Sequence, residues 1–163
     1  MSLEFSTCDL CDLHKDDPEL RVLPPLFRDF GGRLRFAGPV ATVKCHEDNS
    51  LVKAAVDAPG QGRVLVVDGG GSLRKALLGG NLGAAAARNG WAGVVVDGAV
   101  RDLAELAACD VGIRALAPVP MPTVKRNAGE AGVAVQVQGV WVRPGDWLYA
   151  DGDGMLVSAR PLH

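Results

Sequence analysis

Three short runs of apolar, mostly β-branched residues punctuate the first two thirds of the chain. They span residues 64–67, 93–97 and 111–116. Runs of this length, bounded by glycine or charged residues, are typical of strands buried on both faces, as in a parallel sheet. The pattern therefore predicts three core strands of one sheet.

Helical spacing of apolar positions occurs between these runs. It predicts an amphipathic helix over Ser50–Asp57, with Asp48-Asn49 as the cap, and a compact alanine-rich helix over Gly83–Arg88 that ends at Gly90. A further short helix is expected over Ser6–His14, capped by Ser6 or Thr7. Strands and helices in this order indicate an α/β domain.

Alternating apolar and polar positions dominate the last third of the chain. Residues 133–137 and 140–142 form an expected hairpin that turns at Gly139, and residues 147–150 and 155–158 form a second one. Upstream, residues 34–44 have strand character, although Gly38-Pro39 is expected to break it. The fold class predicted is α/β, a layered domain with a mixed sheet and C-terminal β-hairpins, formed by residues 1–163 as one domain.

The candidate chemistry gathers between Gly79 and Glu105. A helix that starts near Gly80–Leu82 presents free backbone N–H groups, and the strand over 93–97 leads to Arg101-Asp102. A guanidinium matches a carboxylate, and an aspartate suits a divalent cation that keeps most of its waters. A small anionic keto acid fits this set. The alternative is that Arg101-Asp102 is a surface ion pair beside an ordinary turn.

Three glycines follow the strand over 64–67, in Asp68-Gly69-Gly70-Gly71-Ser72. The spacings of phosphate-binding and dinucleotide-binding loops are both absent, which argues against a nucleotide site. We interpret the glycines as a backbone wall of the keto-acid pocket, and Asp68 either as a partner of the residues that bind the ligand or as a turn former.

Composition argues against nucleic acid and membrane as direct partners of the protein. The 163 residues are 48% hydrophobic with a net charge of −2, so no basic footprint for direct nucleic-acid binding is present. No apolar run approaches the length of a membrane span, and the N-terminus has no signal-peptide pattern. A cytoplasmic protein without membrane contact is expected.

The four cysteines give little support to a zinc site. Cys8 and Cys11 form a C-x-x-C pair, but Cys45 and Cys109 are scattered and do not supply the second pair of a tetrahedral site. His14 and His46 could complete a set of four ligands by residue type, but nothing in the sequence fixes their geometry. A redox role is also disfavoured, since no strand precedes Cys8.

Four segments carry a resemblance to a known family. They are Phe30-Gly31-Gly32-Arg33 with Phe36-Ala37-Gly38, Val64 to Ser72, Gly80 followed twenty-one residues later by Arg101-Asp102, and Tyr149-Ala150-Asp151. In these segments the chain resembles the family of regulator of ribonuclease E activity A, which also contains the class II 4-hydroxy-4-methyl-2-oxoglutarate aldolases. The resemblance covers essentially the whole chain.

The resemblance implies a swivelling β/β/α fold and a homotrimer, or two trimers paired into a hexamer. It implies that Gly79, Gly80, Asn81 and Leu82 bind substrate through backbone N–H groups, and that Arg101 holds the carboxylate and keto oxygen as the catalytic residue. Asp102 is then the ligand of Mg²⁺ or Mn²⁺. A metal-bound 2-keto acid is set up for C–C cleavage to pyruvate enolate.

Two departures from the aldolases affect the expected reaction. The aldolases have an aspartate where this chain has Gly80, and they extend past this C-terminus to supply an acidic residue to a neighbour. Aldol cleavage needs a base and oxaloacetate decarboxylation does not. The expectation is thus a metal-dependent lyase with the stronger activity on oxaloacetate. The alternative is a protein regulator that binds and inhibits ribonuclease E. Quinone methylation is rejected, because no methyl-donor loop is recognisable.

Overall fold

The computed structural model describes residues 4–163, in which strands and helices alternate before a C-terminal set of short strands. The helices are α1 (Thr7–His14), α2 (Ser50–Asp57), α3 (Gly80–Arg88) and α4 (Leu103–Ala107). The strands are β1 (Arg21–Val22), β2 (Arg28–Asp29), β3 (Phe36–Lys44), β4 (Val64–Asp68), β5 (Ala76–Leu78), β6 (Gly93–Val100), β7 (Gly112–Pro118), β8 (Glu130–Ala131), β9 (Val135–Val137), β10 (Val140–Val142), β11 (Trp147–Asp151) and β12 (Gly154–Ser158).

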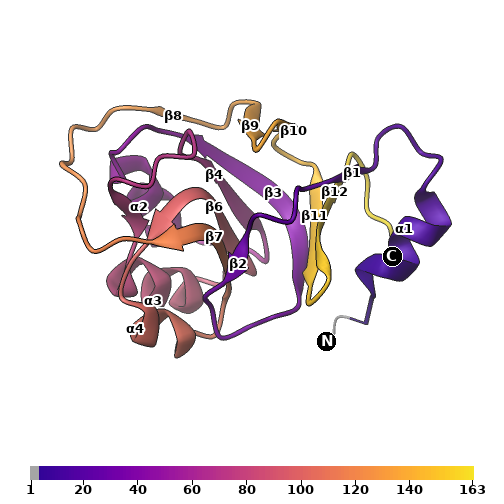
Figure 1. Ribbon diagram of the computed structural model, residues 1–163, viewed down its shortest axis with the longest axis horizontal. Coiled ribbons are helices and arrows are strands. Elements are labelled where there is room, and N and C mark those ends of the chain that lie inside the picture. The colour runs from indigo at the N-terminus through magenta and orange to yellow at the C-terminus, as the bar shows by residue number, and fades with distance from the viewer. Residues whose placement is uncertain (1–3) are drawn as a thin grey trace.

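A parallel sheet forms the centre of the molecule. β3 pairs with β4, β4 with β6 and β6 with β7, all in parallel. Helices α2, α3 and α4 lie together beside this sheet, whereas α1 lies at the opposite end of the molecule near both termini (Figure 1). β11 and β12 extend the sheet on the far side of β3 in antiparallel pairing.

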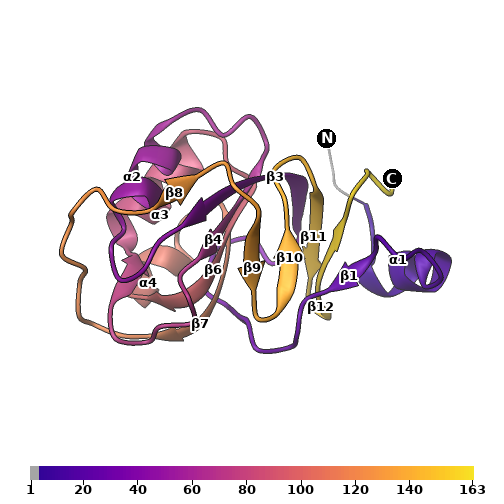
Figure 2. The ribbon, with the colours of Figure 1, turned by 90° about the horizontal axis from the view of Figure 1, so that it is seen from above.

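Both faces of the central sheet are buried, as the apolar runs predicted. Leu65 and Val67 of β4 pack in one core cluster with Val52 and Val56 of α2. The alternate residues of β4 pack in a second cluster with side chains of β9, β10 and β11. The β9–β10 hairpin lies next to β11 and away from the helices (Figure 2). The layers are therefore hairpin, sheet and helix, and the predicted fold class is confirmed.

The expectation that Gly38-Pro39 breaks the strand was wrong. β3 runs through both residues, pairs with β11 over residues 36–39 and then with β4 over residues 40–44. Pro39 is the last residue paired with β11, so its missing N–H falls where the strand exchanges partners. The glycine–proline pair marks a changeover between two parts of the sheet, not an end.

The ends of several elements also differ from the expectation. α3 begins at Gly80, within the start expected near Gly80–Leu82 and before the alanine-rich run at Gly83, and β6 extends from the expected residue 97 to Val100. Ser6 caps α1 by accepting a hydrogen bond from the N–H of Asp9, while Thr7 donates its hydroxyl to Asp151. The short elements β1, β2, β5, β8 and α4, of two to five residues, were not predicted. Within residues 4–163, no helix is long and apolar enough to cross a membrane.

Candidate active site

A cleft of about 170 Å³ lies where β5 and β6 end and α3 begins. Ligand sites in α/β sheets commonly occur at this carboxyl edge of the strands. The residues that line the cleft include all of the predicted site residues: Gly79, Gly80, Asn81, Leu82, Arg101 and Asp102, together with Asn49, Lys53, Ala76, Pro122, Thr123 and Lys125. The structure thus brings the predicted set together in one place.

The conformation of Asp102 directs its carboxylate back towards α3. Asp102 has φ of 61° and ψ of 51°, in the left-handed region, where aspartate is tolerated better than most residues. Its Oδ2 atom accepts a hydrogen bond of 2.8 Å from the N–H of Gly80. Oδ1 has no such partner among the described residues, so one carboxylate oxygen is available to a ligand or cation.

Arg101 and Asp102 do not form the surface ion pair that was the alternative interpretation. Among the described residues Arg101 makes no ion pair, and its only side-chain hydrogen bond is a long one of 3.4 Å from Nη1 to the carbonyl oxygen of Pro120. A Cβ atom on Gly79 would lie 2.7 Å from Asp102 Oδ2 and 3.3 Å from Arg101 Cγ. Glycine at residue 79 therefore lets both side chains cross the start of α3 closely.

The start of α3 presents unpaired donors to the cleft. Gly79 precedes the helix as an N-cap without a side chain, and its carbonyl accepts the first helical hydrogen bond, from Gly83. The N–H groups of Asn81 and Leu82 have no acceptor within residues 4–163. The N–H of Gly80 donates to Asp102 Oδ2 and is not free in this structure, so substrate binding by this group stays a prediction. Two free N–H groups at a helix N-terminus suit an anion.

The carboxylate of Glu105 lies against Gly80, beside the cleft, and no role was predicted for it. A Cβ atom on Gly80 would overlap Glu105 Oε2 and would lie 2.7 Å from its Cδ atom. The carboxylate of Glu105 thus occupies the space into which a side chain at residue 80 would project. The spacing of Asp102 and Glu105, three residues apart at the start of a helix, was the available signal.

One wall of the cleft comes from distant parts of the chain. The extended segment after β7 is anchored to the loop before α2, because Thr123 donates its hydroxyl to Asn49 Oδ1 at 2.8 Å. Near the cleft, the N–H of Ala76 donates to Met121 at 2.8 Å. This wall supplies Lys53 and Lys125, neither of which was predicted, because they lie far from the Gly79–Glu105 segment in sequence.

The glycine-rich segment after β4 is not a wall of this cleft. None of residues 68–72 lines it, and Gly70 lines a separate cavity with Cys45 and His46. Asp68 accepts hydrogen bonds from the N–H of Gly70 and from the N–H of Gln136 on the β9–β10 hairpin. Of the two roles expected for Asp68, turn formation is confirmed, and the same carboxylate secures the hairpin.

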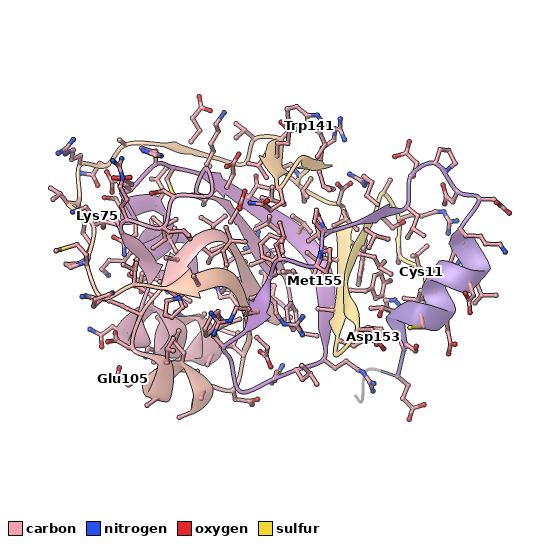
Figure 3. The ribbon with its side chains drawn as sticks, viewed as in Figure 1. Cys11, Lys75, Glu105, Trp141, Asp153 and Met155 are labelled. Carbon is pink, nitrogen blue, oxygen red and sulfur yellow. The ribbon has the colours of Figure 1, made fainter. Side chains whose placement is uncertain are left out.

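The C-x-x-C pair lies far from this cleft, on α1. Figure 3 shows Cys11 on α1 at one end of the molecule and Glu105 on α4 at the other end. A hydrogen bond to Asp153 and its negative charge raise the pKa of the Cys8 thiol, which disfavours the reactive thiolate. All four cysteines are free, and no group of three metal-binding side chains is found in the described part of the chain.

The oxygen donors near the cleft fit a hard divalent cation. Asp102 Oδ1 is the one available oxygen of its carboxylate, and Glu105 lies on the next turn. One or two carboxylates, with the remaining positions taken by water and ligand, are what Mg²⁺ uses in proteins. Zinc in a closed protein site needs four donors, which this set does not offer.

The sequence profile of the RraA-like family, described as Aldolase/RraA, matches residues 7–157. The chain belongs to the RraA-like family. A relative from Albidiferax ferrireducens, named "Putative 4-hydroxy-4-methyl-2-oxoglutarate aldolase", is 67% identical over 99% of both chains.

Solved structures of RraA-like proteins have the same fold. The RNA-processing inhibitor RraA from Thermus thermophilis has a TM-score of 0.92 and 52% identity, covering 98% of this chain and 95% of that one. A Geobacillus kaustophilus protein titled S-adenosylmethionine: 2-dimethylmenaquinone methyltransferase has a TM-score of 0.90 and 43% identity, covering 97% of each chain. Names within the family therefore cover a lyase, an inhibitor and a methyltransferase.

Proposed function

We propose that the protein is a divalent-metal-dependent lyase that cleaves 2-keto acids to pyruvate, acting on 4-hydroxy-4-methyl-2-oxoglutarate and on oxaloacetate. The observation that carries the proposal is that one cleft holds a guanidinium, a carboxylate with a free oxygen and two unpaired helix N–H groups. The aldolase names of the relatives support the first substrate.

Arg101 and the start of α3 bind the two ends of the pyruvyl group. The planar guanidinium of Arg101 is free of ion pairs, so it can hold a carboxylate through two parallel hydrogen bonds. The N–H groups of Asn81 and Leu82 point from the positive end of a helix, where they favour an anion. Donors that are already oriented stabilise the negative charge that develops as the C–C bond breaks.

Asp102 Oδ1 would hold Mg²⁺ or Mn²⁺, which supplies Lewis-acid polarisation of the keto group when bound. The bond from Gly80 N–H to Oδ2 fixes the orientation of this carboxylate before any cation arrives. The close approach of Asp102 to Gly79 adds to that constraint. Preorganised ligands lose little freedom on binding.

Glu105 is the candidate base for aldol cleavage. The C4 hydroxyl of the aldol substrate must lose a proton, and the Glu105 carboxylate lies over Gly80, beside the cleft. Decarboxylation of oxaloacetate needs no such proton removal, because carbon dioxide departs unaided. We expected the decarboxylase to be the stronger activity because of Gly80; the position of Glu105 restores the group that the aldolase reaction needs.

Exposed apolar side chains near the cleft support an assembly of several copies. Met121 and Val124 on the cleft-lining segment are 53% and 58% exposed, and Leu103, which follows Asp102, is also exposed. Large exposed apolar groups that gather in one region often mark an interface. We propose a homotrimer, with pairing into a hexamer as the alternative, in which a neighbouring copy covers these side chains.

Inhibition of ribonuclease E is a second candidate function. The RNA-processing inhibitor from Thermus thermophilis is 52% identical to this chain. Such a role would use the outer surface, and the net charge of −2 permits contacts with protein and provides no basic footprint for RNA. An intact cleft does not distinguish the two functions, since both can reside in one protein.

The test is pyruvate release from each substrate, with and without Mg²⁺, followed by a coupled lactate dehydrogenase reaction. Metal-dependent release from both substrates supports the proposal. A metal-depleted and reloaded protein that releases no pyruvate from either substrate overturns it. In that case, slower RNA cleavage by ribonuclease E on addition of the protein would support the second function.

A further inference from the structure

The cleft carries a second positive charge that the pyruvyl group does not need. Of its lining residues, Arg101, Lys53 and Lys125 are cationic. Lys53 is engaged in an ion pair of 2.6 Å with Asp57, one helical turn along α2. Lys125 makes no ion pair within residues 4–163, and it lines the same cleft as Arg101 from the segment after β7.

The backbone on either side of Lys125 is held firmly. On one side, Thr123 is hydrogen-bonded to Asn49. On the other, the N–H groups of Arg126 and Ala128 donate to Asp48 Oδ2 at 2.8 and 3.1 Å. The Lys125 side chain is exposed, so its ammonium group can turn while its Cα stays in place. Because its backbone is fixed and its side chain is flexible, Lys125 can bind anionic groups that lie at different distances from its Cα atom.

Asp48 is the anchor of this wall. It is 3% exposed, and its other oxygen accepts bonds from the N–H and hydroxyl of Ser50. Burial alone raises the pKa of Asp48, but the hydrogen bonds from Ser50, Ala128 and Arg126 outweigh it and lower the pKa to about 2. Asp48 therefore stays ionised near neutral pH and keeps the segment docked.

We propose that Lys125 binds the second carboxylate of the substrate, the one remote from the keto group, and so selects dicarboxylic 2-keto acids over pyruvate-like monocarboxylic ones. The proposal rests on the proposed function, in which Arg101 holds the first carboxylate. A cleft of about 170 Å³ that is lined by two cationic groups without ion pairs, Arg101 and Lys125, matches a short dianion.

The test is calorimetric titration with two keto acids that the proposed lyase does not cleave. Pyruvate has one carboxylate and 2-oxoglutarate has two. Wild type, Lys125→Gln and a control, Lys75→Gln, are compared in the presence of Mg²⁺. Lys75 is the same residue type and lies outside the cleft, at the edge labelled in Figure 3. Lys125→Gln should weaken 2-oxoglutarate about tenfold, the loss of one charge-assisted hydrogen bond, and leave pyruvate within about twofold.

The outcomes separate this proposal from the proposed function. Equal weakening of both keto acids, or no change in either, overturns the role of Lys125 while the lyase proposal stands. A wild-type protein that binds 2-oxoglutarate no more tightly than pyruvate also overturns it. A wild-type protein that binds neither keto acid contradicts the proposed function itself, and the role of Lys125 is then rejected with it.

Discussion

Substitution of Gly80 by alanine tests whether the Glu105 carboxylate takes part in aldol cleavage. The added methyl group would overlap Glu105 Oε2 and lie 2.7 Å from Cδ and 3.0 Å from Cβ. The carboxylate is the far end of a flexible, exposed side chain, so it can swing into solvent at a cost of about 0.5–1.5 kcal/mol. The protein should remain folded, and the Glu105 carboxylate should leave its place beside the cleft.

The expected effect follows from what a general base contributes. Removal of such a group slows the step by roughly 10²–10⁴-fold, which is about 2.7–5.5 kcal/mol of transition-state stabilisation. Aldol cleavage by Gly80→Ala should fall by about 10²-fold or more. Oxaloacetate decarboxylation should change far less, because it removes no proton from a hydroxyl. The ratio of the two rates is therefore the informative quantity.

The assay is pyruvate release from both substrates at saturating Mg²⁺, after circular dichroism confirms that each variant is folded. Glu105→Gln keeps the shape of the side chain without a base and should reproduce the selective loss; Glu130→Gln, on β8 away from the cleft, is the matched control. The double variant Gly80→Asp with Glu105→Ala moves the carboxylate to residue 80. Its rate of aldol cleavage should be at least about tenfold higher than that of Glu105→Ala alone.

A different pattern of rates would refute this reasoning. If Glu105→Gln cleaves the aldol substrate at the wild-type rate, Glu105 is not the base. If Gly80→Ala slows both reactions equally, the methyl group disturbs the cleft as a whole, and the selective role of the carboxylate is rejected.

Three further predictions address other parts of the account. Arg101→Lys should lower kcat/KM more than tenfold, about 1.4 kcal/mol, since a point charge cannot replace the guanidinium fork; equal activity of the lysine enzyme would exclude bidentate binding. The lowered pKa of Asp48 stabilises the folded protein above about pH 4, and this stabilisation is lost as the pH falls towards 2. The melting temperature should therefore depend less on pH in this range for Asp48→Asn than for wild type. Met121→Glu should reduce the mass seen by light scattering from three times 17.0 kDa to one; an unchanged trimer would remove Met121 from the interface.

The sequence predicted the main features of the fold because they depend on local pattern. The run over β4 is apolar at every residue to Val67, and the structure buries it on both faces. The error at Pro39 arose because a proline inside a run of strand residues resembles a break. Only the pairing of β3, first with β11 and then with β4, shows where a missing donor is tolerated.

The sequence predicted half of the cleft. Gly79–Leu82 and Arg101-Asp102 are joined through the short connection between β5, α3 and β6, so strand order alone brings them together. Lys125 and Asn49 reach the cleft through contacts between segments more than seventy residues apart, which no local pattern encodes. The hydrogen bond from Gly80 to Asp102 depends on a left-handed aspartate, which also leaves no trace in the sequence.

The most direct test of the central claim is metal-dependent pyruvate release by wild type and by Asp102→Asn. Asparagine keeps the size of the side chain and an oxygen for the Gly80 N–H but removes the charge that a divalent cation needs. The account predicts Mg²⁺-dependent release from oxaloacetate and the aldol substrate by wild type and by an Asp110→Asn control outside the cleft, and none above background by folded Asp102→Asn. Undiminished release by Asp102→Asn, or release by wild type that chelation of metal leaves unchanged, would contradict it.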